Sequence, residues 1–112
     1  MRKGDIADME DQQAGKIIAH VDNDLADLIP GYLANRKKDI VAIFAALEKK
    51  DLDAIRIIGH SMKGSGGGYG FDTITDIGML MEKAAKEGRD EDIRLQVNRL
   101  ENYLCQVEIV YD

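Results

Sequence analysis

The chain has 112 residues, a length that suits one domain with a real hydrophobic core and leaves no room for two independent ones. Its composition, 45% hydrophobic and 32% charged with one proline and no tryptophan, indicates a folded helical protein rather than a disordered one. The formal net charge of -6 argues against nucleic acid or an anionic membrane as the main partner, because both bind clustered Lys and Arg.

The N-terminal stretch MRKGDIADMEDQQ has basic residues but no apolar run after them, so it resembles neither a signal peptide nor a membrane anchor. We expect residues 1–14 to form a polar, loosely ordered segment and residues 15–112 to form a helical bundle domain. The single cysteine, Cys105, cannot form an internal disulfide, and its apolar neighbours predict a buried thiol. A reducing cytoplasm is the expected location.

The first half of the domain predicts two helices. The capping residues Asp22-Asn23-Asp24 precede a short first helix, and Pro30 suits the first turn of the next one. That second helix ends at Lys49-Lys50, whose charges favour the negative end of the helix dipole. Its apolar residues recur every three or four positions: Leu33, Ile40, Ile43, Phe44 and Leu47.

Three more helices are expected after this point. Asp51 caps the third, which carries His60; Asp72 or Thr73 caps the fourth, which ends at Gly88. The fifth starts near Asp90, with an apolar stripe of Ile93, Val97, Leu100, Leu104 and Val107. No stretch alternates with the period of two that a half-buried strand needs. We therefore expect an all-α protein, an antiparallel up-down four-helix bundle with a short additional N-terminal helix.

The stretch GHSMKGSGGGYG, Gly59 to Gly70, follows the third apolar stripe and surrounds His60 with glycines. At about 100° per residue, the apolar residues of this helix fall on the side opposite His60, so its imidazole should point into solvent. The face of His60 carries two cations, Arg56 and Lys63, and two residues without side chains, Gly64 and Gly67.

This face suits phosphoryl transfer, which depends on positioning and charge stabilisation. A neutral imidazole offers a nucleophilic nitrogen near neutral pH. Lys63, one turn along, can hold a positive charge beside an oxygen-rich group on the ring, and Gly64 and Gly67 would let a partner surface come close. A solvated surface charge is the simpler interpretation of Arg56.

The residues His60-Ser61-Met62-Lys63-Gly64-Ser65, followed by Gly70, resemble the H-x-x-K-G-S core of histidine-containing phosphotransfer domains, the relay modules of multistep two-component signalling. Beyond them, Ile77, Met81 and Glu82-Lys83-Ala84-Ala85 are similar to the family's next helix. The similarity covers residues 22–110. Gly59, Met62 and the run Gly66–Gly68 depart from the commonest form, and the glycine run leaves the end of the helix open.

The resemblance implies that His60 accepts and donates the phosphoryl group through the ring nitrogen farther from the backbone, with Lys63 beside the phosphate and Gly64 as the access position. The partners would be a sensor histidine kinase and response-regulator receiver domains, whose aspartate exchanges the phosphate and which hold Mg²⁺. The chain itself would be a monomeric phosphocarrier, not an enzyme, with no cofactor or metal. An apolar rim for the receiver is expected at Leu25, Leu28 and Ile29.

Two other functions remain open. The bundle could be the phosphorylated module of a chemotaxis-type histidine kinase, or a helical scaffold that binds partners without chemistry. A nucleotide loop does not fit, because Lys63 precedes Gly64 instead of following it and no strand leads into the glycines. A metal site is not expected, because His20 and His60 lie far apart in sequence and Cys105 has no companion.

Overall fold

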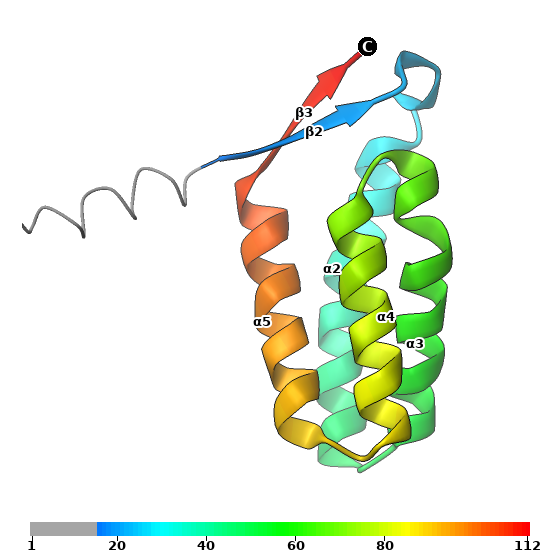
Figure 1. Ribbon diagram of the computed structural model, residues 1–112, viewed down its shortest axis with the longest axis vertical. Helices are drawn as coiled ribbons and strands as arrows, with labels where there is room; N and C mark the ends of the chain where they lie inside the picture. Colours follow the sequence, from blue (N-terminus) through cyan, green and yellow to red (C-terminus); the bar gives the residue numbers. More distant parts are fainter. Residues whose placement is uncertain (1–15) are drawn as a thin grey trace, which may run out of the picture.

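The computed structural model describes residues 16–112 of the chain. Four helices run alternately in opposite directions and form a bundle (Figure 1). They are α2 (Ile29–Glu48), α3 (Leu52–Ser65), α4 (Asp72–Lys86) and α5 (Asp90–Gln106). The remaining elements are the strands β2 (Ile17–Val21) and β3 (Val107–Tyr111) and the 3-10 turns η1 (Asn23–Leu25) and η2 (Gly67–Tyr69). The four predicted long helices are therefore present, whereas the predicted polar segment, residues 1–14, lies outside the described residues.

Local sequence signals explain most of the helix ends. The Asp51 side chain accepts a hydrogen bond of 3.1 Å from the Ala54 N–H and so caps α3. Pro30 lies in the first turn of α2, where its missing N–H costs nothing. Gly88 ends α4 with a φ of 69°, in the left-handed region that glycine adopts without strain. The predicted side-chain cap of α4 is wrong: Asp72 is already helical, and Phe71 precedes it without a capping bond.

The core lies between the four helices and continues under β2. Among the described residues the largest fully buried side chains are Phe71, Ile29, Ile43, Ile55, Met62, Ile74, Ile77, Met81, Ile93, Leu100, Val21 and Val97. The apolar stripe predicted for the last helix is fully buried at Ile93, Val97 and Leu100, whereas Leu104 and Val107 are only half-buried. The apolar stripe of α2 is less completely buried, because Phe44 is partly exposed.

The expectation of helices alone is wrong at both ends of the described chain. Strands β2 and β3 pair in parallel, with Ile17 opposite Val107 and Val21 opposite Tyr111 (Figure 1). The strands are five residues each and lie 90 positions apart in the chain. Such a pair is stabilised by long-range contacts, which a local apolar pattern does not reveal. Val107, assigned above to the last helical stripe, has extended backbone angles and begins β3 instead.

The predicted short N-terminal helix is also absent as an α-helix. Only the 3-10 turn η1 lies at this position. The Asp22 carboxylate caps it by accepting a hydrogen bond of 2.8 Å from the Asp24 N–H. The chain then turns, and α2 begins at Ile29, so Pro30 lies in its first turn as predicted.

Cys105 is exposed, not buried as predicted. At about 100° per residue it lies about 140° from the buried Leu100 on α5, on the side away from the core. Within residues 16–112, no helix is both long and apolar enough to cross a membrane.

Candidate functional site

His60 lies on α3 with its side chain 66% exposed. Ile55 and Met62, on the opposite side of the helix, are fully buried. The predicted orientation of His60 toward solvent is confirmed. The reason is the helical periodicity of α3, which turns its apolar residues inward and leaves the imidazole on the outer face.

Two glycines bring α3 and α4 together beside this histidine. A Cβ atom on Gly59 would lie 2.7 Å from the Glu82 backbone nitrogen and 2.9 Å from the Gly78 carbonyl oxygen. A Cβ atom on Gly78 would in turn overlap the Lys63 backbone nitrogen. Neither position has room for a side chain, because the two backbones touch. The glycine before His60, which departs from the commonest family form, thus sets the distance between the two helices.

This close approach places the Glu82 carboxylate beside His60 and Lys63. Its Oε2 lies 3.0 Å from His60 Nδ1, and its Oε1 lies 2.8 Å from Lys63 Nζ. Lys86, one turn further along α4, has its Nζ 3.8 Å from the same Oε2. The Glu82 side chain is only 9% exposed, so a carboxylate with little access to water is surrounded by charged and polar partners on α3 and α4.

These partners keep Glu82 ionised. The hydrogen bond from Lys63 is the largest influence, and with the His60 hydrogen bond and the two lysine charges it lowers the pKa of Glu82 from 4.5 to about 2. Burial acts in the opposite direction but is outweighed. At neutral pH the group is therefore a carboxylate, and its oxygens can only accept hydrogen bonds.

The charge state of Glu82 determines the tautomer of His60. Since a carboxylate cannot donate, the 3.0 Å contact requires the proton to be on Nδ1 of the ring. In the neutral imidazole, Nε2 then carries the free lone pair. Nε2 is the ring nitrogen farther from the backbone, so Glu82 orients the ring with its nucleophilic nitrogen available.

Glu82 was not predicted as a site residue, although the segment that contains it, Glu82-Lys83-Ala84-Ala85, resembles the family's next helix. Two signals could have indicated it. Gly78, four residues earlier, shares its face of α4, and Met81, next in sequence, belongs to the buried stripe. A charged residue at the border of a buried face needs a partner. The sequence alone does not identify that partner, because the side chains that meet Glu82 depend on how α4 is rotated relative to α3.

The other predicted residues on the face of His60 differ in their surroundings. Gly64 is exposed, and a Cβ atom placed there would have no neighbour within 4 Å. Gly67 lies beyond the end of α3, in η2, so its predicted position on the His60 helix face is wrong. Arg56 forms an ion pair of 2.8 Å with Asp53 on its own helix, which matches the simpler interpretation of a surface charge.

The predicted apolar rim is present only in part. Leu28 is 53% exposed, and Leu25 is half-buried against the core. Ile29 is only 1% exposed, so its assignment to the rim is wrong. It occupies the first position of α2, where it turns into the bundle instead of lying on the outer face of a separate helix.

The glycine-rich segment after the site is anchored by Thr75 of α4. The Thr75 hydroxyl donates to the Lys63 carbonyl at 3.1 Å and accepts from the Gly67 N–H at 2.7 Å. A Cβ atom on Gly66 would lie 2.6 Å from the Thr75 backbone nitrogen, so close packing requires a glycine there. These contacts fix the end of α3 at Ser65 and hold the loop against α4.

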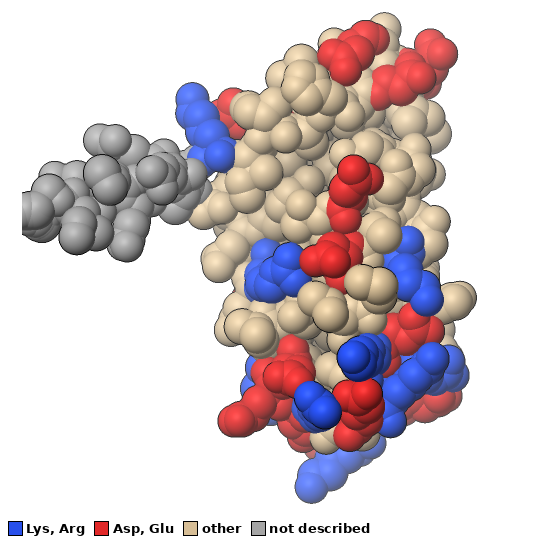
Figure 2. Space-filling view, viewed as in Figure 1, with Lys and Arg blue, Asp and Glu red and all other residues tan. Residues whose placement is uncertain are grey.

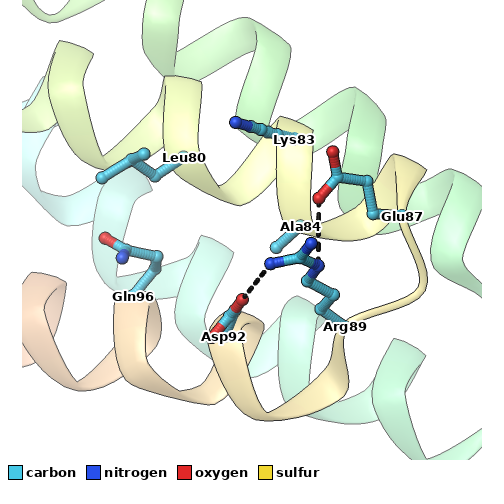
Figure 3. Close-up of a pocket in the computed structure, with 7 residues that line it drawn as sticks. All are labelled: Leu80, Lys83, Ala84, Glu87, Arg89, Asp92 and Gln96. Carbon is cyan, nitrogen blue, oxygen red and sulfur yellow. Dashed lines mark ion pairs between the residues drawn. The ribbon is translucent and has the colours of Figure 1, made fainter.

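The charged side chains on the face of the molecule drawn in Figure 2 are of both signs. Figure 2 shows Lys and Arg mixed with Asp and Glu over the lower half of this face, without a continuous basic patch. A cavity of about 180 Å³ between α4 and α5 is crossed by Arg89, which pairs with Glu87 at 3.0 Å and with Asp92 at 3.6 Å (Figure 3). The cavity is lined by two cations and two carboxylates, so its charges neutralise one another. No cluster of three or more potential metal ligands occurs among these residues.

Comparison with protein families agrees with this geometry. The model of the Hpt domain family matches residues 6–109, nearly the whole chain. The chain belongs to the Hpt domain family. No curated protein and no solved structure matches it. Hpt domains carry phosphoryl groups on histidine in phosphorelays and interact with histidine kinases and response-regulator receivers; they are phosphocarrier modules, not autonomous enzymes. The family that the sequence resembles is thus confirmed.

Proposed function

We propose that His60 is the phosphoryl acceptor and donor of this Hpt domain and that it exchanges the group with aspartates of receiver domains. The observation that carries the proposal is the contact between Glu82 and His60 Nδ1, which leaves the Nε2 lone pair of an exposed ring free. The other histidine, His20, lies on β2 and has only an exposed contact of 3.5 Å with Asp112. Within residues 16–112 it has neither a buried carboxylate nor a lysine beside it.

In the proposed step, Nε2 attacks the phosphorus of an aspartyl phosphate on the receiver. The Nε2–P bond forms as the P–O bond breaks, and the aspartate leaves as a carboxylate with the electron pair. Nδ1 keeps its proton, so the phosphorylated ring carries a positive charge next to Glu82. The buried carboxylate stabilises that charge. The reverse step regenerates the neutral imidazole.

Lys63 and Gly64 would assist from the same helix. Lys63 Nζ is bound to Glu82 before transfer, and its side chain is 39% exposed, so it can turn toward a phosphoryl group on Nε2. Gly64 leaves open space one turn from His60, through which the receiver surface can approach. Both roles are inferred from the positions of Lys63 and Gly64, about one helical turn from His60 on α3.

The test compares the two histidines. A panel of receiver domains is charged with acetyl phosphate, freed of it and incubated with the full chain. We expect an acid-labile, base-stable phosphate on the wild-type chain and on His20→Gln, but not on His60→Gln. Circular dichroism of both variants checks that the helices persist, which is expected because both side chains are exposed.

Equal labelling of His60→Gln and the wild type would refute the assignment of His60. Loss of label in His20→Gln alone would move the site to β2. If no receiver in the panel labels the wild type, phosphoramidate supplies the phosphoryl group directly, and labelling that does not depend on His60 would then contradict the proposal.

A further inference from the structure

The two edges of the β2–β3 ribbon are not equivalent. Val21 and Tyr111 are opposite each other, and the Asp112 N–H donates to the Val21 carbonyl at 2.9 Å. In a parallel ladder, every second residue of each strand directs both of its backbone groups to the partner strand. The backbone N–H and C=O groups of Val21 therefore point toward β3. The backbone groups of Tyr111 point away from β2, and so do those of Ile109 and Val107, which lie two and four residues earlier on the same strand.

The outer edge of β2 is covered by the bundle. The His20 carbonyl points away from β3 and lies against Gly70, where a Cβ atom would be only 2.7 Å from its oxygen. Gly70 has a φ of 95°, so a glycine is required both for the backbone angle and for the contact. No further strand can pair on this side at that point.

The outer edge of β3 is open within residues 16–112. The Val107 N–H is used, because it donates to the Tyr103 carbonyl at the end of α5. None of the turn and cap hydrogen bonds of these residues uses the Val107 carbonyl or the backbone groups of Ile109 and Tyr111. A row of unpaired donors and acceptors on an edge strand is a template for another strand.

We propose that this edge pairs with β3 of a second copy of the chain, antiparallel and centred on Ile109. In this register the two Ile109 residues exchange both of their hydrogen bonds. Each Tyr111 N–H donates to the Val107 carbonyl of the other copy. These four hydrogen bonds use the outward-pointing backbone groups of β3 and do not need the Val107 N–H, which is already bonded. Each copy donates and accepts the same two bonds, so the two-fold arrangement is self-complementary.

The side chains suit the same register. Val107 faces Tyr111 of the second copy, a β-branched residue opposite an aromatic one. Glu108 faces Val110 instead of another Glu108, so like charges are not opposed. Ile18 and Val110, 51% and 41% exposed, lie on the outward face of the ribbon and would become part of a four-stranded sheet. The ribbon itself has only two strands and rests on the bundle through β2, and a four-stranded sheet is more stable than a two-stranded one.

This dimer goes beyond the histidine chemistry and differs from the monomer expected from the sequence. The strands are short, so the interface is small and the association should be weak, in the micromolar to millimolar range. His60 lies on α3, not on the ribbon, so phosphoryl transfer does not depend on the pairing.

The test is sedimentation of the full chain over a concentration series, with matched substitutions at Val110. Val110→Glu opposes Glu108 of the second copy and should raise the dimer dissociation constant about threefold to tenfold, whereas Val110→Lys should lower it. The charge swap Glu108→Lys with Val110→Glu should restore association. Amide exchange at Ile109 and Tyr111 should slow as the concentration rises. Melting curves of dilute samples separate these effects from changes in the fold.

A chain that stays monomeric at millimolar concentration would overturn the proposal. A dimer that responds equally to Val110→Glu and Val110→Lys, or that leaves the Ile109 amide unprotected, would show a different interface. Because transfer from receivers is measured separately, neither result bears on the role of His60.

Discussion

The contact between Gly59 and α4 allows a sharp test of how the site is built. A Cβ atom on Gly59 would lie 2.7 Å from the Glu82 nitrogen, 0.7 Å less than the 3.4 Å at which ordinary van der Waals contact begins. The atoms in the way are backbone, so the helices must separate by about that amount. Overpacking of this kind costs about 1–3 kcal/mol, and alanine returns up to about 1 kcal/mol of helix propensity.

Gly59→Ala should therefore destabilise the fold by up to about 2 kcal/mol and lower the melting temperature by up to about 10 °C. The same shift would move Glu82 away from the histidine, and the 3.0 Å contact with His60 Nδ1 would open to about 3.7 Å, too long for a hydrogen bond. Phosphoryl transfer should slow even at temperatures where the variant is fully folded.

Gly64→Ala is the matched control, because it makes the same change on the same helix where no atom lies within 4 Å. It should melt at the wild-type temperature or slightly above it. Urea denaturation and initial transfer rates are measured on the same preparations. If Gly59→Ala is as stable as Gly64→Ala, the helices are not in contact at Gly59. If it is less stable but transfers at the wild-type rate, the spacing does not position Glu82 for transfer.

Three further outcomes are expected. Gly64→Leu should keep the helical spectrum and melting temperature but slow transfer, because its side chain enters the approach to the histidine; an unchanged rate would exclude an access role. Leu28→Glu should weaken receiver binding without lowering the melting temperature, whereas Ile29→Glu should unfold the bundle; calorimetry and binding titration distinguish them. The lowered pKa of Glu82 implies stabilisation that is complete above pH 4.5 and is lost as the pH falls toward 2. Glu82→Gln should flatten this part of the acid-unfolding curve, and an unchanged curve would contradict the ion pairs.

The sequence predicted the features that depend on one helix at a time. The helical periodicity of α3 was sufficient to predict that His60 faces solvent, and the same reasoning located the buried residues Ile93, Val97 and Leu100 of α5. The contacts between helices could not be predicted. The contact of Gly59 with Gly78 and the position of Glu82 depend on how α4 is rotated against α3, and an apolar stripe fixes that angle only coarsely. The ribbon was missed because neither strand has a strong pattern of its own.

The parallel pairing of β2 with β3 also determines how the described chain would respond to force. A pull applied at Lys16 and Asp112 acts at opposite ends of the ribbon, because Ile17 is opposite Val107 and Val21 is opposite Tyr111. The load would then run along the strands and be shared by all the hydrogen bonds between them, so these bonds must break together rather than one after another. The ribbon would therefore act as a mechanical clamp, and in a single-molecule stretching experiment the helices should stay folded until the strands slide apart.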